Sequence, residues 1–326
     1  MPPIKLGIIG CGIAARELHL PPLLALRDQF EIAVVCNHTE AKAREFSQMA
    51  GNVPYVLDYR QVLAMPEIEA VDIILPIELN YRVTHDALTA GKHVLVEKPL
   101  AANLAEARSM VQLEKETPRV TMVAENFRYS PAFAAIRQYL EQGQIGKVQA
   151  VFWNKFYHMD AANQYVQTQW RIAHKHQGGF ITDGGVHQIA VLRDLCGDLT
   201  GCGAFTKRMN PAIGKVDSLS FQFKTTQDVN GVLNIFASSP DYQEDRLLLI
   251  GETGSITFAD NLLTLQKNGR TIIREQFQAA DLGYKQELEA FYEAVRHRQP
   301  VKSSFFEAYC DLKGILDALQ LAGGES

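Results

Sequence analysis

Short apolar runs and amphipathic stretches alternate along the first 124 residues of the chain. Six runs rich in apolar and β-branched residues predict strands, at 4–9, 32–36, 53–56, 71–75, 93–96 and 120–124. The segments between them predict helices, at 40–50, 59–63, 82–90 and 104–116. Because strands that alternate with helices form parallel sheets with right-handed crossovers, we expect a doubly wound α/β domain over residues 1–124.

The pattern changes after about residue 125, where a predicted helix at 131–142 is followed by alternating apolar and polar positions. These positions predict six strands, at 148–156, 204–207, 218–224, 231–237, 246–250 and 255–258. Short turns join several of the runs, which favours an antiparallel or mixed sheet in a second, α+β domain over residues 125–326. Two amphipathic helices, 285–298 and 305–321, close the chain and can pack back on the first domain. Ser304 and Glu307 form a capping box at the second of them.

A glycine-rich turn, Gly10-Cys11-Gly12-Ile13-Ala14-Ala15, follows the first strand directly and opens a helix. Gly10 permits a tight bend, and Gly12 lets the backbone approach a pyrophosphate whose charge the helix N-terminus favours. Ala15 keeps the helix close to the strand. The same spacing also occurs in glycine turns without a ligand, but its place between a strand and a helix predicts a Rossmann dinucleotide-binding domain.

The residue that follows the second strand bears on the choice of cofactor. An acidic side chain here holds the ribose hydroxyls of NAD in many such domains, but this chain has Asn37, followed by His38 and, at some distance, Lys42. A carboxylate would repel a 2′-phosphate, whereas a neutral amide with cationic neighbours tolerates one. We therefore expect NADP or NAD and favour NADP; the alternative is that Asn37 only caps the next turn and the chain takes NAD.

Charge and composition exclude several classes of partner. The formal charge of 32 minus 37, or −5, gives no basic footprint for a nucleic acid or an anionic membrane. The longest apolar run, 70–77, contains Asp72 and Pro76, so no membrane span is expected. No export signal precedes the first strand, and the five widely spaced cysteines suit neither a disulfide framework nor a metal site. We therefore expect a cytoplasmic protein with reduced thiols and no metal.

A second glycine-rich segment carries the candidate acid and base. Residues 178–187 read Gly-Gly-Phe-Ile-Thr-Asp-Gly-Gly-Val-His, and the apolar stretch 186–195 predicts a helix that ends at Gly197. If helical geometry already holds at Asp183, its side chain and that of His187 project from one face. Glycines at 184 and 185 cost a helix about 1 kcal/mol each relative to alanine, which indicates a close approach there, by substrate in our interpretation. A lone histidine is more often structural, but one beside an acid and glycines is a candidate for proton transfer.

Lys98 is the third candidate, at the end of a buried strand on the expected ligand edge. Pro99 biases the lysine to extended conformations. An ammonium directed at a carbonyl or alkoxide oxygen would stabilise the charge that hydride transfer creates there. The alternative is a salt bridge with the neighbouring Glu97.

These motifs together resemble the Gfo/Idh/MocA family of NAD(P)-dependent oxidoreductases. The resemblance runs in order through most of the chain, over 10–15, 91–99, 126–131, 170–171, 178–187 and 251–255. It implies that the second domain is an open, mostly antiparallel sheet whose face forms a homodimer or homotetramer interface. It also implies substrates among sugars, inositols and related polyols.

By this resemblance, Lys98 corresponds to a lysine that contacts substrate and nicotinamide, and Asp183 and His187 to an aspartate and a general acid/base. The cofactor contacts that the motifs and the resemblance predict are Gly10, Gly12, Ile13, Ala15, Asn37, His38, Lys42, Leu75, Pro76, Glu97, Lys98, Trp170 and Arg171. The predicted substrate contacts are Asn126, Arg128, Tyr129, Tyr157, Asp183 and His187.

The chain departs from the family pattern at three places. Gly184 replaces a usual aliphatic residue, Asn37 replaces the common acid, and Asn80 with Tyr81 stands where many relatives have histidine. These departures leave the shape of the pocket, the choice of cofactor and the nicotinamide contacts open.

The expected reaction is hydride transfer between a nicotinamide and the carbon of a substrate hydroxyl that sits between Lys98 and His187. The histidine takes the hydroxyl proton as hydride leaves. Two alternatives are a non-catalytic regulator that senses NAD(P) and a glycoside hydrolase with tightly held NAD. The three polar residues together argue against the regulator, because a sensor needs no proton-transfer set. The hydrolase would release no reduced cofactor.

Overall fold

The computed structural model describes residues 1–160, 162–210 and 213–323 and divides into two compact units. The first unit comprises Met1–Asn126 and Gly283–Tyr309, and the second comprises Phe127–Leu282 and Cys310–Ser326. The first division lies two residues beyond the predicted domain boundary at residue 124, and the segment that begins at Gly283 returns to the first unit.

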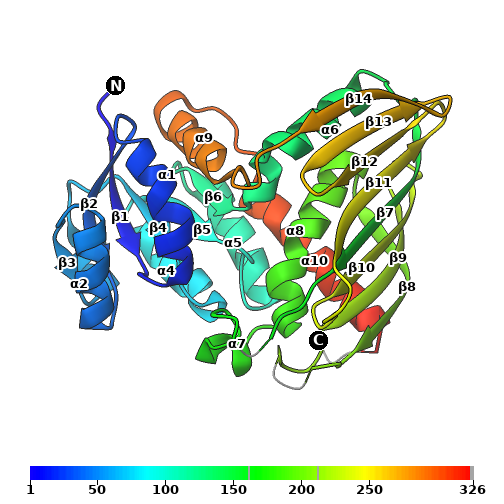
Figure 1. Ribbon diagram of the computed structural model, residues 1–326. Coiled ribbons are helices and arrows are strands. Elements are labelled where there is room, and N and C mark those ends of the chain that lie inside the picture. Colours follow the sequence, from blue (N-terminus) through cyan, green and yellow to red (C-terminus); the bar gives the residue numbers. More distant parts are fainter. Residues whose placement is uncertain (161, 211–212, 324–326) are drawn as a thin grey trace. The chain divides into compact units, whose positions relative to one another are not determined.

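The first unit contains a six-stranded parallel sheet in the order β3-β2-β1-β4-β5-β6 (Figure 1). Its strands are Ile4–Ile9 (β1), Phe30–Cys36 (β2), Tyr55–Val56 (β3), Ala70–Ile73 (β4), His93–Glu97 (β5) and Thr121–Ala124 (β6). Its helices include Leu20–Ala25 (α1), Glu40–Met49 (α2), Tyr59–Ala64 (α3), Asn80–Thr89 (α4), Leu104–Glu116 (α5) and Tyr284–His297 (α9). The predicted doubly wound fold is confirmed, and the strand order reverses at β1, between β2 and β4. The carboxyl ends of β1 and β4 therefore form the switch point at which such sheets bind ligands.

The second unit contains an eight-stranded sheet in the order β14-β13-β12-β11-β7-β10-β9-β8, with every pair antiparallel except β7 with β10. Its strands are Val148–Phe156 (β7), Leu199–Lys207 (β8), Ser218–Thr225 (β9), Asn230–Phe236 (β10), Glu244–Gly251 (β11), Ser255–Ala259 (β12), Leu262–Lys267 (β13) and Arg270–Gln276 (β14). The helices Pro131–Glu141 (α6), Gln169–Ile172 (α7) and Gly179–Cys196 (α8) belong to this unit, and Phe305–Leu321 (α10) begins in the first unit and continues into the second. The predicted mostly antiparallel sheet is confirmed.

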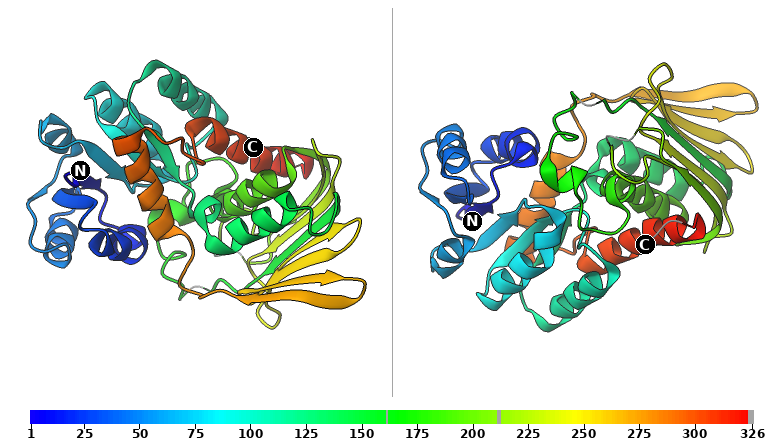
Figure 2. Two further views of the ribbon diagram at one scale, coloured as in Figure 1. Left: turned by 90° about the horizontal axis from the view of Figure 1, so that it is seen from above. Right: turned by 90° about the horizontal axis from the view of Figure 1, so that it is seen from below.

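One face of the second sheet is covered by α6 and α8 (Figures 1 and 2). Alternate residues of β9 and β10, such as Phe221, Leu233 and Ile235, are buried. The opposite face carries a polar row in which Ser220 donates to Asn234 (2.8 Å) and Asn234 donates to Asn154 (2.9 Å). This alternation is what a sheet with one packed face requires.

In the second unit the structure has one hairpin that was not predicted and one helix that starts earlier than predicted. The hairpin of β13 and β14 was not predicted, although Asn268 and Gly269 between the strands have positive φ angles of 50° and 72°. An Asn-Gly pair between alternating runs is the strongest local hairpin signal, so the sequence did contain the information. Helix α8 begins at Gly179, seven residues before the predicted start at 186, so that Asp183 lies inside the helix.

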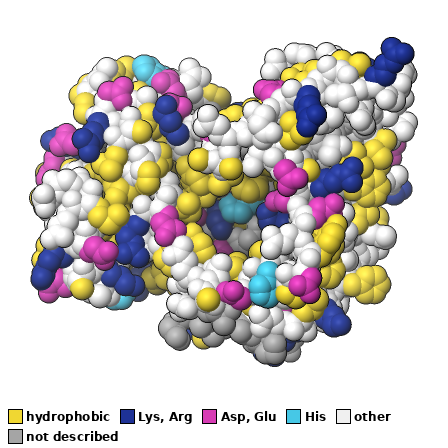
Figure 3. All heavy atoms as spheres, in the orientation of Figure 1, with side chains coloured by type: hydrophobic (Ala, Val, Ile, Leu, Met, Phe, Trp, Pro, Cys, Tyr) yellow, Lys and Arg dark blue, Asp and Glu magenta, His cyan; other side chains and the backbone are white. Residues whose placement is uncertain are grey.

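Charged side chains of both signs are interspersed on the face shown in Figure 3, as expected for a chain with a formal charge of −5. Among the helices of the described residues, none is long and apolar enough to cross a membrane.

His93, the first residue of β5, is a half-buried acceptor. The backbone N–H of Val120 donates to its Nδ1 at 2.9 Å. Burial, followed by the positive charge of Arg119, lowers the pKa of His93 from 6.5 to about 4. Protonation of Nδ1 would remove this acceptor, so the hydrogen bond from Val120 also favours the neutral ring.

This lowered pKa predicts a loss of stability in mild acid. The folded state binds the proton more weakly than the unfolded chain, so the contribution of His93 is complete above pH 6.5 and is lost as the pH falls toward 4. Between pH 7.5 and 5.0 the loss is about 2 kcal/mol. Urea unfolding of His93→Asn, whose amide oxygen accepts the same N–H without titrating, should show a pH dependence smaller by that amount. An identical pH dependence in both proteins would contradict the assignment.

Candidate active site

The glycine turn after β1 leaves room for a dinucleotide. Gly10 has a φ of +112°, and a Cβ there would lie 2.0 Å from the carbonyl oxygen of Ile74, so no other residue fits. A Cβ on Gly12 would meet no atom within 4 Å, so the backbone faces open space. Ala15 is fully buried, as expected where a helix packs closely on a strand. These three positions fit the pyrophosphate of NAD or NADP, which binds at such a turn.

Two further predicted cofactor residues lie beside this turn. The amide oxygen of Asn37, after β2, accepts the backbone N–H of Cys11 at 3.3 Å, and its nitrogen donates to the carbonyl of Thr39 at 3.2 Å. Leu75, after β4, approaches Gly10, since a Cβ on that glycine would lie 3.3 Å from Leu75 Cδ2. The structure thus brings the ends of β1, β2 and β4 together. His38 and Lys42 are exposed, and Ile13 and Pro76 are half-buried.

Lys98 follows β5 and is half-buried. The side-chain amide of Asn80 donates to the carbonyls of Glu97 (2.9 Å) and Pro99 (3.0 Å), one on each side of the lysine. Oε1 of Glu97 lies 2.9 Å from Nε2 of His19. The main chain on both sides of Lys98 is therefore held by the Asn80 side chain, and the side chain of the neighbouring Glu97 is held by His19, which precedes α1.

Asp183 and His187 lie one turn apart on α8 and so share a face of that helix. The Asp183 carboxylate accepts a hydrogen bond from Nε of Arg171 at 2.8 Å. The His187 ring stacks on Phe127 with a centroid distance of 4.6 Å and an interplanar angle of 21°. The stack fixes the plane of a half-buried imidazole.

Gly184 and Gly185 of α8 lie in different surroundings. A Cβ on Gly185 would lie 3.0 Å from Ile235 and 3.1 Å from Ile315, so the predicted close approach is real but comes from packed side chains, not substrate. A Cβ on Gly184 would meet only the hydroxyl of Tyr157, at 3.9 Å. Gly184 therefore faces open space beside a phenol.

Tyr157, directly after β7, is a neutral hydrogen-bond donor. Burial raises its pKa well above the usual value, and the negative charges of Asp183, Asp245 and Asp217 raise it further. Its hydroxyl therefore keeps its proton at any physiological pH and can donate to an oxygen of a bound molecule.

Trp170 and Arg171, in α7, join the same group of residues. The Arg171 guanidinium lies over the Trp170 ring, 4.0 Å from its centroid, and 5.0 Å from that of Tyr165. Since Arg171 also binds Asp183, the predicted nicotinamide contacts and the predicted acid are connected in the structure. A planar aromatic and a guanidinium suit a flat aromatic ligand.

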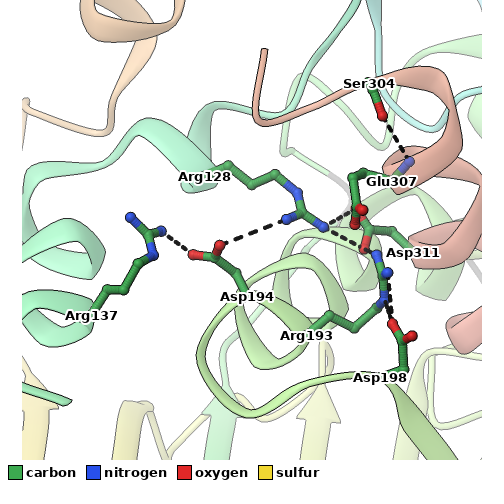
Figure 4. A network of polar contacts seen from close by, with 8 residues as sticks. All are labelled: Arg128, Arg137, Arg193, Asp194, Asp198, Ser304, Glu307 and Asp311. Atoms are coloured by element: carbon green, nitrogen blue, oxygen red, sulfur yellow. Dashed lines mark hydrogen bonds and ion pairs between the residues drawn. The ribbon is translucent and has the colours of Figure 1, made fainter. Parts of the chain in front are cut away.

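Arg128 lies in a buried ion-pair network (Figure 4). Its Nη2 donates to both carboxylate oxygens of Asp311, at 2.8 and 2.9 Å, and its Nη1 lies 3.9 Å from Asp194. Arg193 also donates to Asp311, at 2.5 Å, and to Asp198. Arg128 is 4% exposed and pairs with these carboxylates, and its predicted contact with substrate stays a prediction. Asn126 and Tyr129 are also buried.

No group of three or more His, Cys, Asp or Glu side chains is arranged to hold a metal ion in the parts of the chain that the structure describes.

The doubly wound sheet, the glycine turn and the polar group on α8 define a dinucleotide-dependent oxidoreductase. Residues 4–125 match the oxidoreductase family with an NAD-binding Rossmann fold, and residues 133–257 match the GFO/IDH/MocA C-terminal domain. The chain therefore belongs to the Gfo/Idh/MocA family and is an NAD(P)-dependent oxidoreductase. An uncharacterized protein of Saccharomyces cerevisiae is 32% identical over 79% of this chain and 74% of its own length. The D-apiose dehydrogenase of Paraburkholderia graminis is 28% identical over 74% of this chain and 62% of its own.

Solved structures show the same fold over the whole chain. An oxidoreductase from Thermotoga maritima is 36% identical, has a TM-score of 0.91, and covers 98% of this chain and 97% of its own. A 3-ketoreductase from Actinomadura kijaniata, in complex with NADP, has a TM-score of 0.83 at 22% identity over 98% and 97%. The WlbA dehydrogenase of Bordetella pertussis, in complex with NADH, has a TM-score of 0.87 at 19% identity over 99% and 96%. At these lower identities the last two support the fold alone.

Proposed function

We propose that the protein transfers hydride between NADP or NAD and a hydroxyl-bearing carbon of a sugar, inositol or related polyol. The observation that carries the proposal is the pairing of Asp183 and His187 on α8 beside the open space of Gly184 and the hydroxyl of Tyr157. Relatives named as D-apiose dehydrogenase and levoglucosan dehydrogenase act on sugars of this kind and support the substrate class.

Each polar residue has a separate part in this reaction. His187 takes the proton of the substrate hydroxyl in oxidation and returns it in reduction, and the stack on Phe127 holds its ring in place. Asp183, held by Arg171, orients the substrate or supports the imidazolium. Lys98 stabilises the negative charge on the substrate oxygen. The bound nicotinamide supplies or accepts the hydride.

We favour NADP, because Asn37 offers an amide where a carboxylate would repel a 2′-phosphate. The structural neighbours include complexes with NADP and with NADH, so the fold accommodates both. A panel of sugars and polyols with each cofactor, followed by absorbance of the reduced nicotinamide, tests the choice. Turnover without release of reduced cofactor would favour the glycoside hydrolase, and the absence of turnover would favour the regulator.

Lys98→Ala is expected to lower kcat by about 10²- to 10³-fold, as the loss of one donor to a developing oxyanion does. The affinity for cofactor, measured by fluorescence titration, should change much less. Lys92→Ala is the control. It removes another lysine of the first unit, whose ammonium donates to the backbone carbonyls of Met65 and Ile68. Unchanged kinetics in Lys98→Ala would reduce Lys98 to a partner of Glu97.

The outer face of the second sheet is proposed to form an interface with a second copy of the chain. Phe205 on β8 is 80% exposed, and Phe152 and Ile250 on neighbouring β7 and β11 are 39% and 37% exposed. Exposed aromatic side chains on a sheet face are typical of interfaces. Light scattering should give a dimer or tetramer, and Phe205→Glu should shift it toward monomer. A monomeric wild-type protein would contradict the proposal.

A further inference from the structure

A buried histidine in the first unit lies between two carboxylates and is not used by the proposed reaction. Nδ1 of His19 lies 2.8 Å from Oδ2 of Asp72, and Nε2 lies 2.9 Å from Oε1 of Glu97. A neutral imidazole has a single N–H, so only the protonated ring donates to both carboxylates. Burial alone lowers the pKa of His19, but the charge and hydrogen bond of Asp72, and then those of Glu97, raise it well above the usual value.

A further buried acid that interacts with this group is held neutral, so it adds no third negative charge. Glu287, on α9, is 1% exposed. Burial raises its pKa well above the usual value, and the charges of Glu97, Glu125 and Asp72 raise it further against the lowering effect of His19. The imidazolium therefore has Asp72 and Glu97 as its counter-ions, and breaking either pair would leave a charge buried.

The backbone around His19 is distorted in a way that the sequence explains. Residues Ala15–His19 form a π-helical turn in which the N–H of Leu20 donates to the carbonyl of Ala15. Pro21 and Pro22 follow at the start of α1 and have no N–H to give to the preceding turn. Single π-helical turns occur frequently at functional sites, where they re-aim one side chain. Here the last residue of the turn is His19.

A second buried side chain holds the same segment from another element. Asn80, the first residue of α4, is fully buried, and its amide nitrogen donates to the carbonyls of Glu97 (2.9 Å) and Pro99 (3.0 Å). His19 binds the side chain of Glu97, and Asn80 binds the main chain on both sides of Lys98. No residue other than Lys98 lies between the two carbonyls.

We propose that His19 and Asn80 are positioning residues that fix the backbone from which Lys98 reaches the substrate oxygen. The inference rests on the proposed function of Lys98 and names the groups that make it effective. A lysine side chain has four flexible carbons, so its ammonium is directed only if its own main chain is immobile. A displacement of about 1 Å at a reacting group costs about 10²-fold in rate.

The first test is a double-mutant cycle with the best sugar or polyol of the panel. His19→Gln and Asn80→Asp should each lower kcat by about 10²-fold while KM and cofactor affinity change little. In the Lys98→Ala background the same substitutions should change kcat by less than about twofold, because residues that act through Lys98 lose their effect with it. If His19 or Asn80 had only a structural role, the fold-loss in kcat of the double variant would equal the product of the fold-losses of the two single variants. If Asn80→Asp does not fold, Asn80→Ala, which also lacks the amide donor and adds no charge, is used in its place.

The second test needs neither cofactor nor substrate. Amide hydrogen exchange of a peptide that covers residues 94–101 should become faster in His19→Gln and Asn80→Asp of the free protein. His93→Asn is the matched control, since it replaces a half-buried histidine at the start of β5, the strand that leads to Lys98. That control should leave both kcat at pH 7.5 and the exchange of residues 97–101 unchanged.

The outcomes separate this inference from the function on which it rests. Suppose that Lys98→Ala loses activity. If His19→Gln and Asn80→Asp then leave kcat unchanged, or if their losses multiply with that of Lys98→Ala, the inference is overturned and the proposed function stands. If Lys98→Ala retains full activity, both are overturned.

Discussion

Replacing His187 with alanine is expected to lower kcat by about 10²- to 10⁴-fold, the usual contribution of a general acid or base. The imidazole is the proton-transfer group of the proposed reaction, and its ring lies flat against Phe127 at 4.6 Å. Cofactor affinity should hardly change, because a general acid or base acts on the proton of the substrate hydroxyl and is not needed to hold the dinucleotide. Steady-state kinetics and fluorescence titration of NADP and NAD measure the two quantities separately.

His187→Phe separates proton transfer from stacking. Phenylalanine can preserve the aromatic contact with Phe127 but has no nitrogen to carry a proton. We expect it to be as inactive as His187→Ala and closer to wild type in its unfolding midpoint. His85→Ala, an exposed histidine on α4, controls for the loss of an imidazole away from this stack and should keep full turnover.

Two results would contradict the role of His187. If His187→Phe retains turnover, the aromatic contact is the function of the residue and the proton acceptor must be another group. If kcat and the pH–rate profile are both unchanged in His187→Ala, chemistry at this helix face is not rate-determining or does not occur.

The sheet of the first unit could be predicted because β1, β4, β5 and β6 are buried along nearly their whole length. Such strands appear as nearly continuous apolar runs, for example at 71–75 and 93–96, and are unmistakable against the helices between them. The glycine turn followed from the same reasoning, since only glycine tolerates the φ of +112° at Gly10. Local geometry and local sequence agree in this region.

The positioning group at Lys98 could not be predicted, because it depends on which strands are neighbours. His19 meets Asp72 and Glu97, which are 53 and 78 residues away in sequence, because β4 and β5 are adjacent in the sheet. The two prolines after His19 were a local signal of an unusual turn, but they do not identify its partners. Asn80 departs from the family pattern, but the sequence does not show that its amide donates to the carbonyls of Glu97 and Pro99.

The start of α8 was misplaced for a local reason. Four glycines within residues 178–185 weaken a helix prediction, and the apolar periodicity becomes clear only at Val186. In the structure, Ile235 and Ile315 fill the space that a side chain at Gly185 would need, so tertiary packing overrides the low helix propensity. The i, i+4 relation of Asp183 and His187 was nevertheless correct.

Asp311→Ala is expected to destabilise the folded protein by about 3–5 kcal/mol, as the loss of one partner from a buried ion pair does. Asp311 is 1% exposed, and its removal leaves the guanidiniums of Arg128 and Arg193 without their shared carboxylate (Figure 4). Urea unfolding gives the change in free energy. Asp317→Ala, on the same helix α10, breaks an exposed pair with Lys313 and should cost less than about 1 kcal/mol.

The same network decides between two roles for Arg128. The sequence predicts a contact with substrate, whereas the structure commits its guanidinium to Asp311 and Asp194. If the role is structural, Arg128→Met should also destabilise the protein, and the double variant Arg128→Met with Asp311→Leu should recover part of the loss. Neither member of the Arg128–Asp311 pair then leaves an unpaired charge, and Arg193 keeps its pair with Asp198. At temperatures where these variants are folded, KM should match that of the wild type. A raised KM in Arg128→Met that the double variant does not restore would return Arg128 to the substrate site.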